Sequence, residues 1–134
     1  MNISSFDDLL QAARLQDEPQ RLLFVFAGVE LPDDSTPEQR AGFEAGEGGA
    51  LVPLMCVDKS PVEIENFGAL VDESNTLGQP WRIVFVAALS GTHGGSPTSA
   101  DAELPLQRME EAIRLGAHAN YIPFDRQGQL VFFG

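Results

Sequence analysis

Three runs of apolar residues alternate along this chain with segments that have the spacing of amphipathic helices. The runs are Leu22–Val29, Leu51–Val57 and Ile83–Leu89. Each run is rich in Val, Leu, Ile and Phe and nearly continuous, which is typical of strands buried on both faces. Both faces of a sheet are covered when helices lie on each side of it. The alternation therefore predicts an α/β fold with a central sheet between helical layers.

The segments between the runs predict four helices, over residues 6–13, 36–46, 60–78 and 104–115. In the first, apolar residues recur with the i, i+3, i+4, i+7 spacing of a helix face, and Ser4 or Ser5 can serve as its N-cap. The second and third begin with a capping residue, a proline at the first helical position and a Gln or Glu three residues after the cap. We expect the third, opened by Ser60, to be the longest.

The last fifteen residues have a different pattern, because two short apolar runs flank Asp125-Arg126-Gln127-Gly128. Asp and Gly at these places are typical of a tight turn, so residues 119–133 predict an antiparallel β-hairpin. The whole chain, residues 1–134, then forms a single-domain α/β sandwich with a mixed sheet of about five strands. Parallel crossovers come first and the hairpin lies at one edge. An apolar C-terminal strand needs a partner, either within the chain or in a homodimer.

The charge balance excludes two classes of partner. Eight basic residues stand against 20 acidic ones, for a net charge of −12, and Lys59 is the only lysine. Nucleic acids and anionic membranes both require basic patches, so we expect neither as a partner. The acidity favours a basic protein partner or simply keeps the chain in solution. The N-terminus lacks the pattern of a signal peptide and no apolar stretch approaches the ~20 residues that span a bilayer, so we expect a cytoplasmic protein.

Cofactor and metal motifs are absent from the sequence. Cys56 is the only cysteine, so no intrachain disulfide can form, and its apolar neighbours predict a buried, inert thiol. Two histidines, His93 and His118, without a zinc spacing leave transition-metal sites unsupported. We therefore expect no cofactor and no metal, and the sequence identifies no catalytic residue.

Several segments also carry a resemblance to a known family. They are Asp7-Asp8-Leu9-Leu10, Arg21–Ala27, Gly49-Ala50-Leu51-Val52-Pro53, Met55-Cys56-Val57-Asp58-Lys59 and Phe124-Asp125-Arg126. In these segments the chain resembles a family of small uncharacterised proteobacterial proteins that often carry the inherited label "ribonucleotide reductase subunit alpha". The resemblance spans nearly the whole chain but implies no catalytic residues. The label conflicts with the chemistry, because a reductase large subunit needs a redox-active cysteine pair and a further radical-bearing cysteine, and this chain has one cysteine.

If the three main strands are parallel, their carboxyl ends meet at one edge of the sheet, where open α/β sheets bind ligands. Arg21 and Arg82, which precede their strands, then lie at the opposite edge. The structural alternative is that Asp, Ser and Gly occur there because turns and helix caps require them. The candidate ligand-binding residues at the carboxyl ends are Asp33, Asp34, Asp58, Lys59, Ser90, Thr92 and His93.

These residues support two classes of function. The leading hypothesis is a non-enzymatic binding or protein-interaction domain, with a small-molecule ligand of unknown identity, a protein partner or a second copy of the chain. The alternative is a small hydrolase or phosphoryl-handling protein that uses Asp58, Ser90 and His93 in one crevice. In a variant of that alternative, Asp33, Asp34 and Asp58 bind Mg²⁺ through their carboxylate oxygens.

Overall fold

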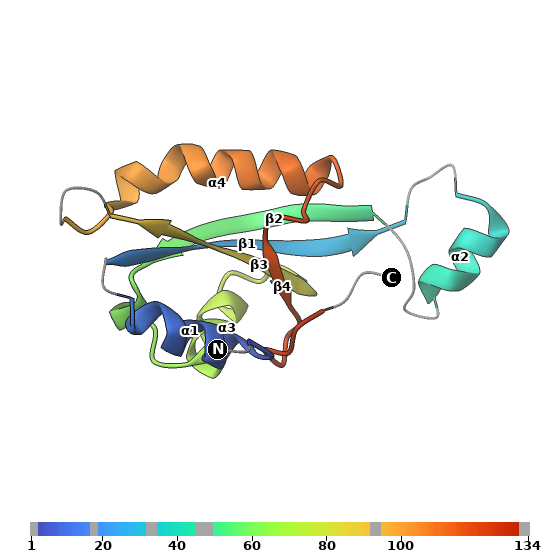
Figure 1. The fold of residues 1–134 in the computed structure, drawn as a ribbon. Coiled ribbons are helices and arrows are strands. Elements are labelled where there is room, and N and C mark those ends of the chain that lie inside the picture. The colour runs from blue at the N-terminus through green and yellow to red at the C-terminus, as the bar shows by residue number, and fades with distance from the viewer. Residues whose placement is uncertain (1–2, 17–18, 32–34, 45–49, 92–94, 132–134) are drawn as a thin grey trace.

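The computed structural model describes residues 3–16, 19–31, 35–44, 50–91 and 95–131, and it has helices on both faces of one sheet (Figure 1). The expected α/β class is confirmed. The elements in chain order are α1 (Phe6–Arg14), β1 (Gln20–Glu30), α2 (Pro37–Glu44), β2 (Ala50–Lys59), the 3-10 turn η1 (Pro61–Glu63), α3 (Phe67–Asn75), β3 (Ile83–Ser90), α4 (Ser99–Arg114) and β4 (Ile122–Phe124).

The described strands form a four-stranded sheet in the order β2-β1-β3-β4, and every neighbouring pair is antiparallel. The prediction of parallel crossovers is therefore wrong. A helical segment between two apolar runs suggested a crossover, but α2 lies beyond the end of the sheet rather than across its face (Figure 1). The chain can thus return directly beside β1 as β2. Since β2 and β3 both run opposite to β1, their last residues lie beside the first residues of β1.

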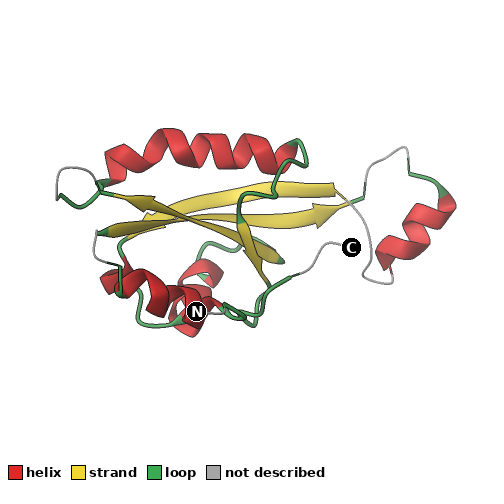
Figure 2. Cartoon of the chain, viewed as in Figure 1, coloured by secondary structure: helices red, strands yellow, loops and turns green. Residues whose placement is uncertain are grey.

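The sheet lies between two helical layers, each with its own apolar core (Figure 2). On one face, α1, η1 and α3 pack over Leu22, Phe24 and Phe26 of β1. On the other face, α4 packs over Leu23 and Val25. Residues 22–28 of β1 are all buried, as expected for the strand that is central to both cores.

The expected burial of the second apolar run is wrong, because no residue of β2 is buried. This strand is at the edge of the sheet, where one side of its backbone lacks a neighbouring strand in the described part of the chain. A bulge interrupts its pairing with β1: Phe26 lies opposite Met55 and Ala27 opposite Pro53, so Leu54 is the extra residue. Leu51, Leu54, Met55 and Val57 contact the two cores as partly buried side chains, so the cores explain the apolar sequence of β2 in part.

Local capping rules predicted the starts of α1 and α2 well. Ser5 caps α1 by accepting a hydrogen bond from the Asp8 amide. At α2, the Gln39 amide donates to the Thr36 hydroxyl (3.2 Å) and the Thr36 amide donates to the Gln39 side chain (2.8 Å). This reciprocal pair is the capping box that the sequence predicted.

The other two helices differ from the predictions. The third segment is not one long helix: η1 ends at Glu63, and Asn66 caps a separate α3 by accepting from the Ala69 amide (2.8 Å). The longest described helix is α4, which starts at Ser99 rather than near residue 104 and so contains Pro105 in its interior. A capping box between Thr98 and Asp101 favours this earlier start.

The C-terminal hairpin is found in part. After β4, the turn at residues 125–128 closes with a hydrogen bond from the Gly128 amide to the Asp125 carbonyl (3.1 Å), and Gly128 has a φ of 77°. Beyond it, Leu130 forms a bridge to Phe124 and its amide donates to the Ser4 carbonyl (3.2 Å). The hairpin is therefore paired within the chain as far as residue 131, and residues 132–134 lie outside the described part. No helix in the described residues is long and apolar enough to cross a membrane.

Candidate functional site

The predicted site residues do not form the crevice that parallel strands would have made. β1 runs antiparallel to β2 and β3, so its last residue lies at the opposite ends of these strands from theirs. The segment after β1 therefore does not start beside Asp58, Lys59 and Ser90. Arg21, expected at the far edge, lies beside Asp58 instead. Asp33, Asp34, Thr92 and His93 lie outside the described residues. The structure therefore places three of the seven candidates at the same ends of neighbouring strands: Asp58, Lys59 and Ser90.

Asp58 is held by two partners on the α4 face of the sheet. Its carboxylate accepts from the Arg21 guanidinium (2.5 Å) and from the Ser99 hydroxyl at the start of α4 (2.7 Å). Partial burial raises the pKa of Asp58, but the hydrogen bonds from Ser99 and Arg21 and the arginine charge outweigh it, so the net pKa is lowered. An ionised carboxylate stabilised in this way is a weak general base, and its role is to join β2, β1 and α4.

Lys59 and Ser90 point to the other face of the sheet. The Lys59 ammonium pairs with the Glu73 carboxylate of α3 (2.9 Å). The Ser90 hydroxyl accepts a hydrogen bond from the Gln20 side-chain amide (2.9 Å). Successive residues of a strand face opposite sides, so Gln20 and Arg21 lie on different faces, and so do the Ser90 and Asp58 side chains bound to them. A shared crevice for Asp58 and Ser90 is therefore wrong. The described residues also contain no group of three His, Cys, Asp or Glu that could hold a metal ion.

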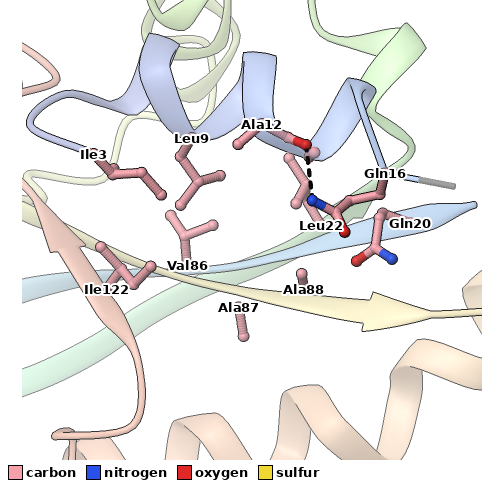
Figure 3. A pocket seen from close by; sticks show the side chains of 11 residues that line it. Ile3, Leu9, Ala12, Gln16, Gln20, Leu22, Val86, Ala87, Ala88 and Ile122 are labelled. Atoms are coloured by element: carbon pink, nitrogen blue, oxygen red, sulfur yellow. Dashed lines mark hydrogen bonds between the residues drawn. The ribbon is translucent and has the colours of Figure 1, made fainter. Parts of the chain in front are cut away.

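An apolar hollow lies on the α1 face, between α1 and the strands β1, β3 and β4 (Figure 3). It is a pocket of about 220 Å³ that opens to solvent. Ile3 and Leu9 project towards Val86 and Ile122 across it, as Figure 3 shows. Within the described part of the chain, the residues that line it are Ile3, Leu9, Ala12, Ala13, Gln16, Gln20, Leu22, Val86, Ala87, Ala88 and Ile122.

Two glutamines are the only residues with polar side chains in this lining, and none of the lining residues is charged. The Gln16 side-chain amide donates to the Ala12 carbonyl (3.2 Å), and the Gln20 side-chain amide donates to the Ser90 hydroxyl. These glutamines lie together at one end of the pocket (Figure 3). A glutamine side chain carries an amide carbonyl that accepts hydrogen bonds as well as an NH₂ group that donates them. The pocket thus combines an apolar interior with an uncharged polar end.

The pocket forms because small residues face each other across α1 and β3. Ala12 and Ala13 on the helix and Ala88 on the strand leave the space that larger side chains would fill. Ala88 lies opposite Leu22 in the register of β1 and β3, so its methyl group points to the α1 face. Helical spacing identified the buried face of α1 in the sequence, but no pattern indicated that Gln16 and Gln20 would meet.

Comparisons with protein-family models, with curated proteins and with solved structures find no match to this chain. The resemblance seen in the sequence therefore stays a prediction.

Proposed function

We propose that this chain is a non-enzymatic binding domain and that its ligand is a small, neutral, mainly aliphatic molecule held in the pocket between α1 and β3. The observation that carries the proposal is the open apolar cavity of about 220 Å³ with two glutamine amides at one end. A dry, apolar cavity of roughly 150 Å³ is sufficient to bind benzene. A cavity of this size therefore suits a ring or a medium-length chain with one polar group.

The charge of the surroundings selects against ionised ligands. None of the lining residues that the structure describes carries charge, and burial of an unpaired charge among Ile, Leu and Val side chains is costly. The net charge of −12 further disfavours anions in the surrounding solvent. A hydroxyl group suits the glutamine end, since it can donate to the side-chain carbonyl of Gln16.

Binding without catalysis fits the same lining. Its described residues include no nucleophile, no titratable side chain and no metal ligand of the usual kinds. The Ser90 hydroxyl beside it is held by Gln20 and lies on the opposite face from Asp58. These contacts favour a binding role over the hydrolase alternative.

The test is an NMR titration with 1-octanol, with octanoate as the charged counterpart of the same chain length. At about 0.8 kcal/mol per buried CH₂, roughly six buried carbons contribute about 5 kcal/mol. This corresponds to a Kd of about 0.2 mM. We expect 1-octanol to shift the methyl resonances of Ile3, Leu9 and Ile122, and octanoate to bind at least tenfold more weakly.

Ala88→Leu supplies the matched variant, because a leucine at this position fills the pocket. We expect it to abolish the octanol shifts while leaving the chain folded. Ala100→Leu makes the same change on the exposed start of α4 and should leave binding unchanged. Octanol binding that is equal in the two variants, or absent from the unmodified chain, would contradict the proposed function.

A further inference from the structure

The edge strand β2 is apolar along most of its length, including residues that belong to neither core. Its first eight residues, Ala50–Val57, carry no charge, and no residue of the ten in the strand is buried. The described residues place no strand on its outer side. Proteins normally protect a long edge strand with charges, and an apolar edge without them is a surface for pairing with another strand.

The direction of the backbone groups shows which part of β2 is available. At the two ends of the β1–β3 ladder, the Pro19 carbonyl accepts from the Gly91 amide and the Ala27 carbonyl accepts from the Arg82 amide, both at 2.9 Å. The backbone groups of the odd-numbered residues of β1 therefore face β3. Their partners on β2 direct their own backbone groups away from β1. These outward residues are Leu51, Pro53, Cys56 and Asp58.

This arrangement explains Pro53, whose nitrogen faces outward and leaves no gap in the ladder with β1. Cys56, which was expected to be buried, is exposed on this edge strand. Three amides, those of Leu51, Cys56 and Asp58, are directed outward, and so are the carbonyls of all four outward residues. The outer side of β2 is thus a set of donors and acceptors spread over a strand about 33 Å long.

We propose that β2 pairs antiparallel with β2 of a second copy of this chain, so that two four-stranded sheets join into one. In the register that overlaps the full strand, Leu51 lies opposite the second copy's Asp58 and Pro53 opposite its Cys56. All four residues point to the α4 face, because each is paired with an odd-numbered residue of β1. The residues whose backbone groups face β1 match as well, because Val52 lies opposite Val57 of the second copy. The bulge at Leu54 and Met55 lies at the centre of the paired strands.

The bulge makes this match possible. Without it, pairing of the first residue with the last in a ten-residue strand would bring residues of opposite faces together. The extra residue restores the agreement of faces on both sides of the two-fold axis. A surface that is complementary to itself is what a two-fold symmetric interface requires.

Charge favours a second copy at this edge over other approaches of two such chains. A chain with a net charge of −12 repels its copy over most orientations, but Ala50–Val57 itself carries no carboxylate, and Glu110 of α4 lies next to Cys56. The Asp58 carboxylate next to this segment is neutralised by Arg21. This proposal concerns a different surface from the octanol pocket, and either can fail without the other.

Sedimentation equilibrium of the full chain gives the first test. We expect a mass of twice 14.5 kDa for the unmodified chain at tens of micromolar concentration. Val52→Glu adds two carboxylates to each interface at a partly exposed position outside both cores, and we expect it to sediment at 14.5 kDa. Val62→Glu is the matched control: Val62 is 86% exposed on η1, so this variant should remain a dimer.

Two further readouts keep the proposal testable if Val52→Glu is poorly folded. Hydrogen exchange should slow at the Leu51, Cys56 and Asp58 amides as the concentration of the unmodified chain rises. Pro53→Cys should form an intermolecular disulfide with Cys56, since opposite residues of paired strands lie within disulfide range. A monomeric unmodified chain, a dimer that is unaffected by Val52→Glu, or exchange at β2 independent of concentration would overturn the proposal. Association that persists in Val52→Glu would belong to another surface.

Discussion

The turn at Gly128 offers a test in which backbone strain and steric contact can be separated. Gly128 has a φ of 77°, and its carbonyl accepts a hydrogen bond from the Phe6 amide (2.7 Å), which joins the hairpin to α1. A Cβ atom at this position would lie 3.0 Å from Cδ2 of Phe67. The Phe67 ring is 5% exposed and lies 5.1 Å from the Phe6 ring, so it has little room to move.

The structure supplies a control for the strain alone. Gly78 has a φ of 71°, and a Cβ there would meet nothing within 4 Å. An alanine with positive φ costs about 1–2 kcal/mol. Loss of glycine freedom in the unfolded chain returns about 0.4–1 kcal/mol. Gly78→Ala should therefore lower the free energy of unfolding by about 1 kcal/mol. In Gly128→Ala, overpacking against Phe67 adds about 1–3 kcal/mol, for a total of about 2–4 kcal/mol.

Urea denaturation followed by circular dichroism measures both variants. We expect the midpoint to fall in both, and to fall further in Gly128→Ala, with the slope m unchanged. Gly116→Ala, with a φ of 79° and open space around its Cβ, should agree with Gly78→Ala. Equal losses for Gly78→Ala and Gly128→Ala would show that the Phe67 contact has no energetic effect, and the reasoning would be refuted.

Three other predictions concern hydrogen bonds and titration. Asp58→Asn should lower the free energy of unfolding by about 1–2 kcal/mol at pH 7, because charge-assisted bonds are lost from a partly buried site. Since the pKa of Asp58 is lowered in the folded chain, its contribution is present above the unfolded value of 3.8 and is lost as the pH falls through the folded value. Urea denaturation at pH 7 and pH 3 should therefore show a difference between Asp58→Asn and the unmodified chain that shrinks in acid. Burial, and then the nearby Glu110 carboxylate, raise the pKa of the Cys56 thiol to about 11. Iodoacetamide should label Cys56 slowly at pH 8 and much faster near pH 11, and Glu110→Gln should increase the rate at pH 8; rapid labelling at pH 8 would contradict this. Ser74→Ala removes the acceptor of the Trp81 indole N–H (2.9 Å) in the core and should cost about 1–3 kcal/mol by Trp81 fluorescence in urea, whereas no loss would mean that the indole finds another partner.

The sequence predicted the helical layers on both faces of the sheet and the starts of α1 and α2, but it did not predict the directions of the strands. Capping residues determine helix starts over a few residues, so Thr36 and Ser5 could be interpreted without knowledge of the fold. Strand direction depends on where the connecting segment packs. Residues 31–49 contain a helix in either arrangement, and only its position beyond the sheet distinguishes a direct return from a crossover.

The candidate site was predicted less well, for the same physical reason. Asp58, Lys59 and Ser90 were correctly expected at strand ends, but the prediction that they share a crevice depended on parallel strands. The pocket depends on the long-range packing of Ala12 and Ala88, whose side chains are common and give no local signal. Its polar end depends on Gln20 at the first position of β1, a place that is equally suited to a residue with no role in binding.

The hairpin after β4 also determines how far assembly can proceed. Leu130 pairs with Phe124, and its amide donates to the Ser4 carbonyl, so the N-terminal segment covers this end of the sheet. A sheet with an unpaired strand at each of its two edges could add copies without limit and grow into a fibre. Here the chain's own residues already pair along β4, so the association proposed for β2 would stop at a closed pair and would not propagate through β4.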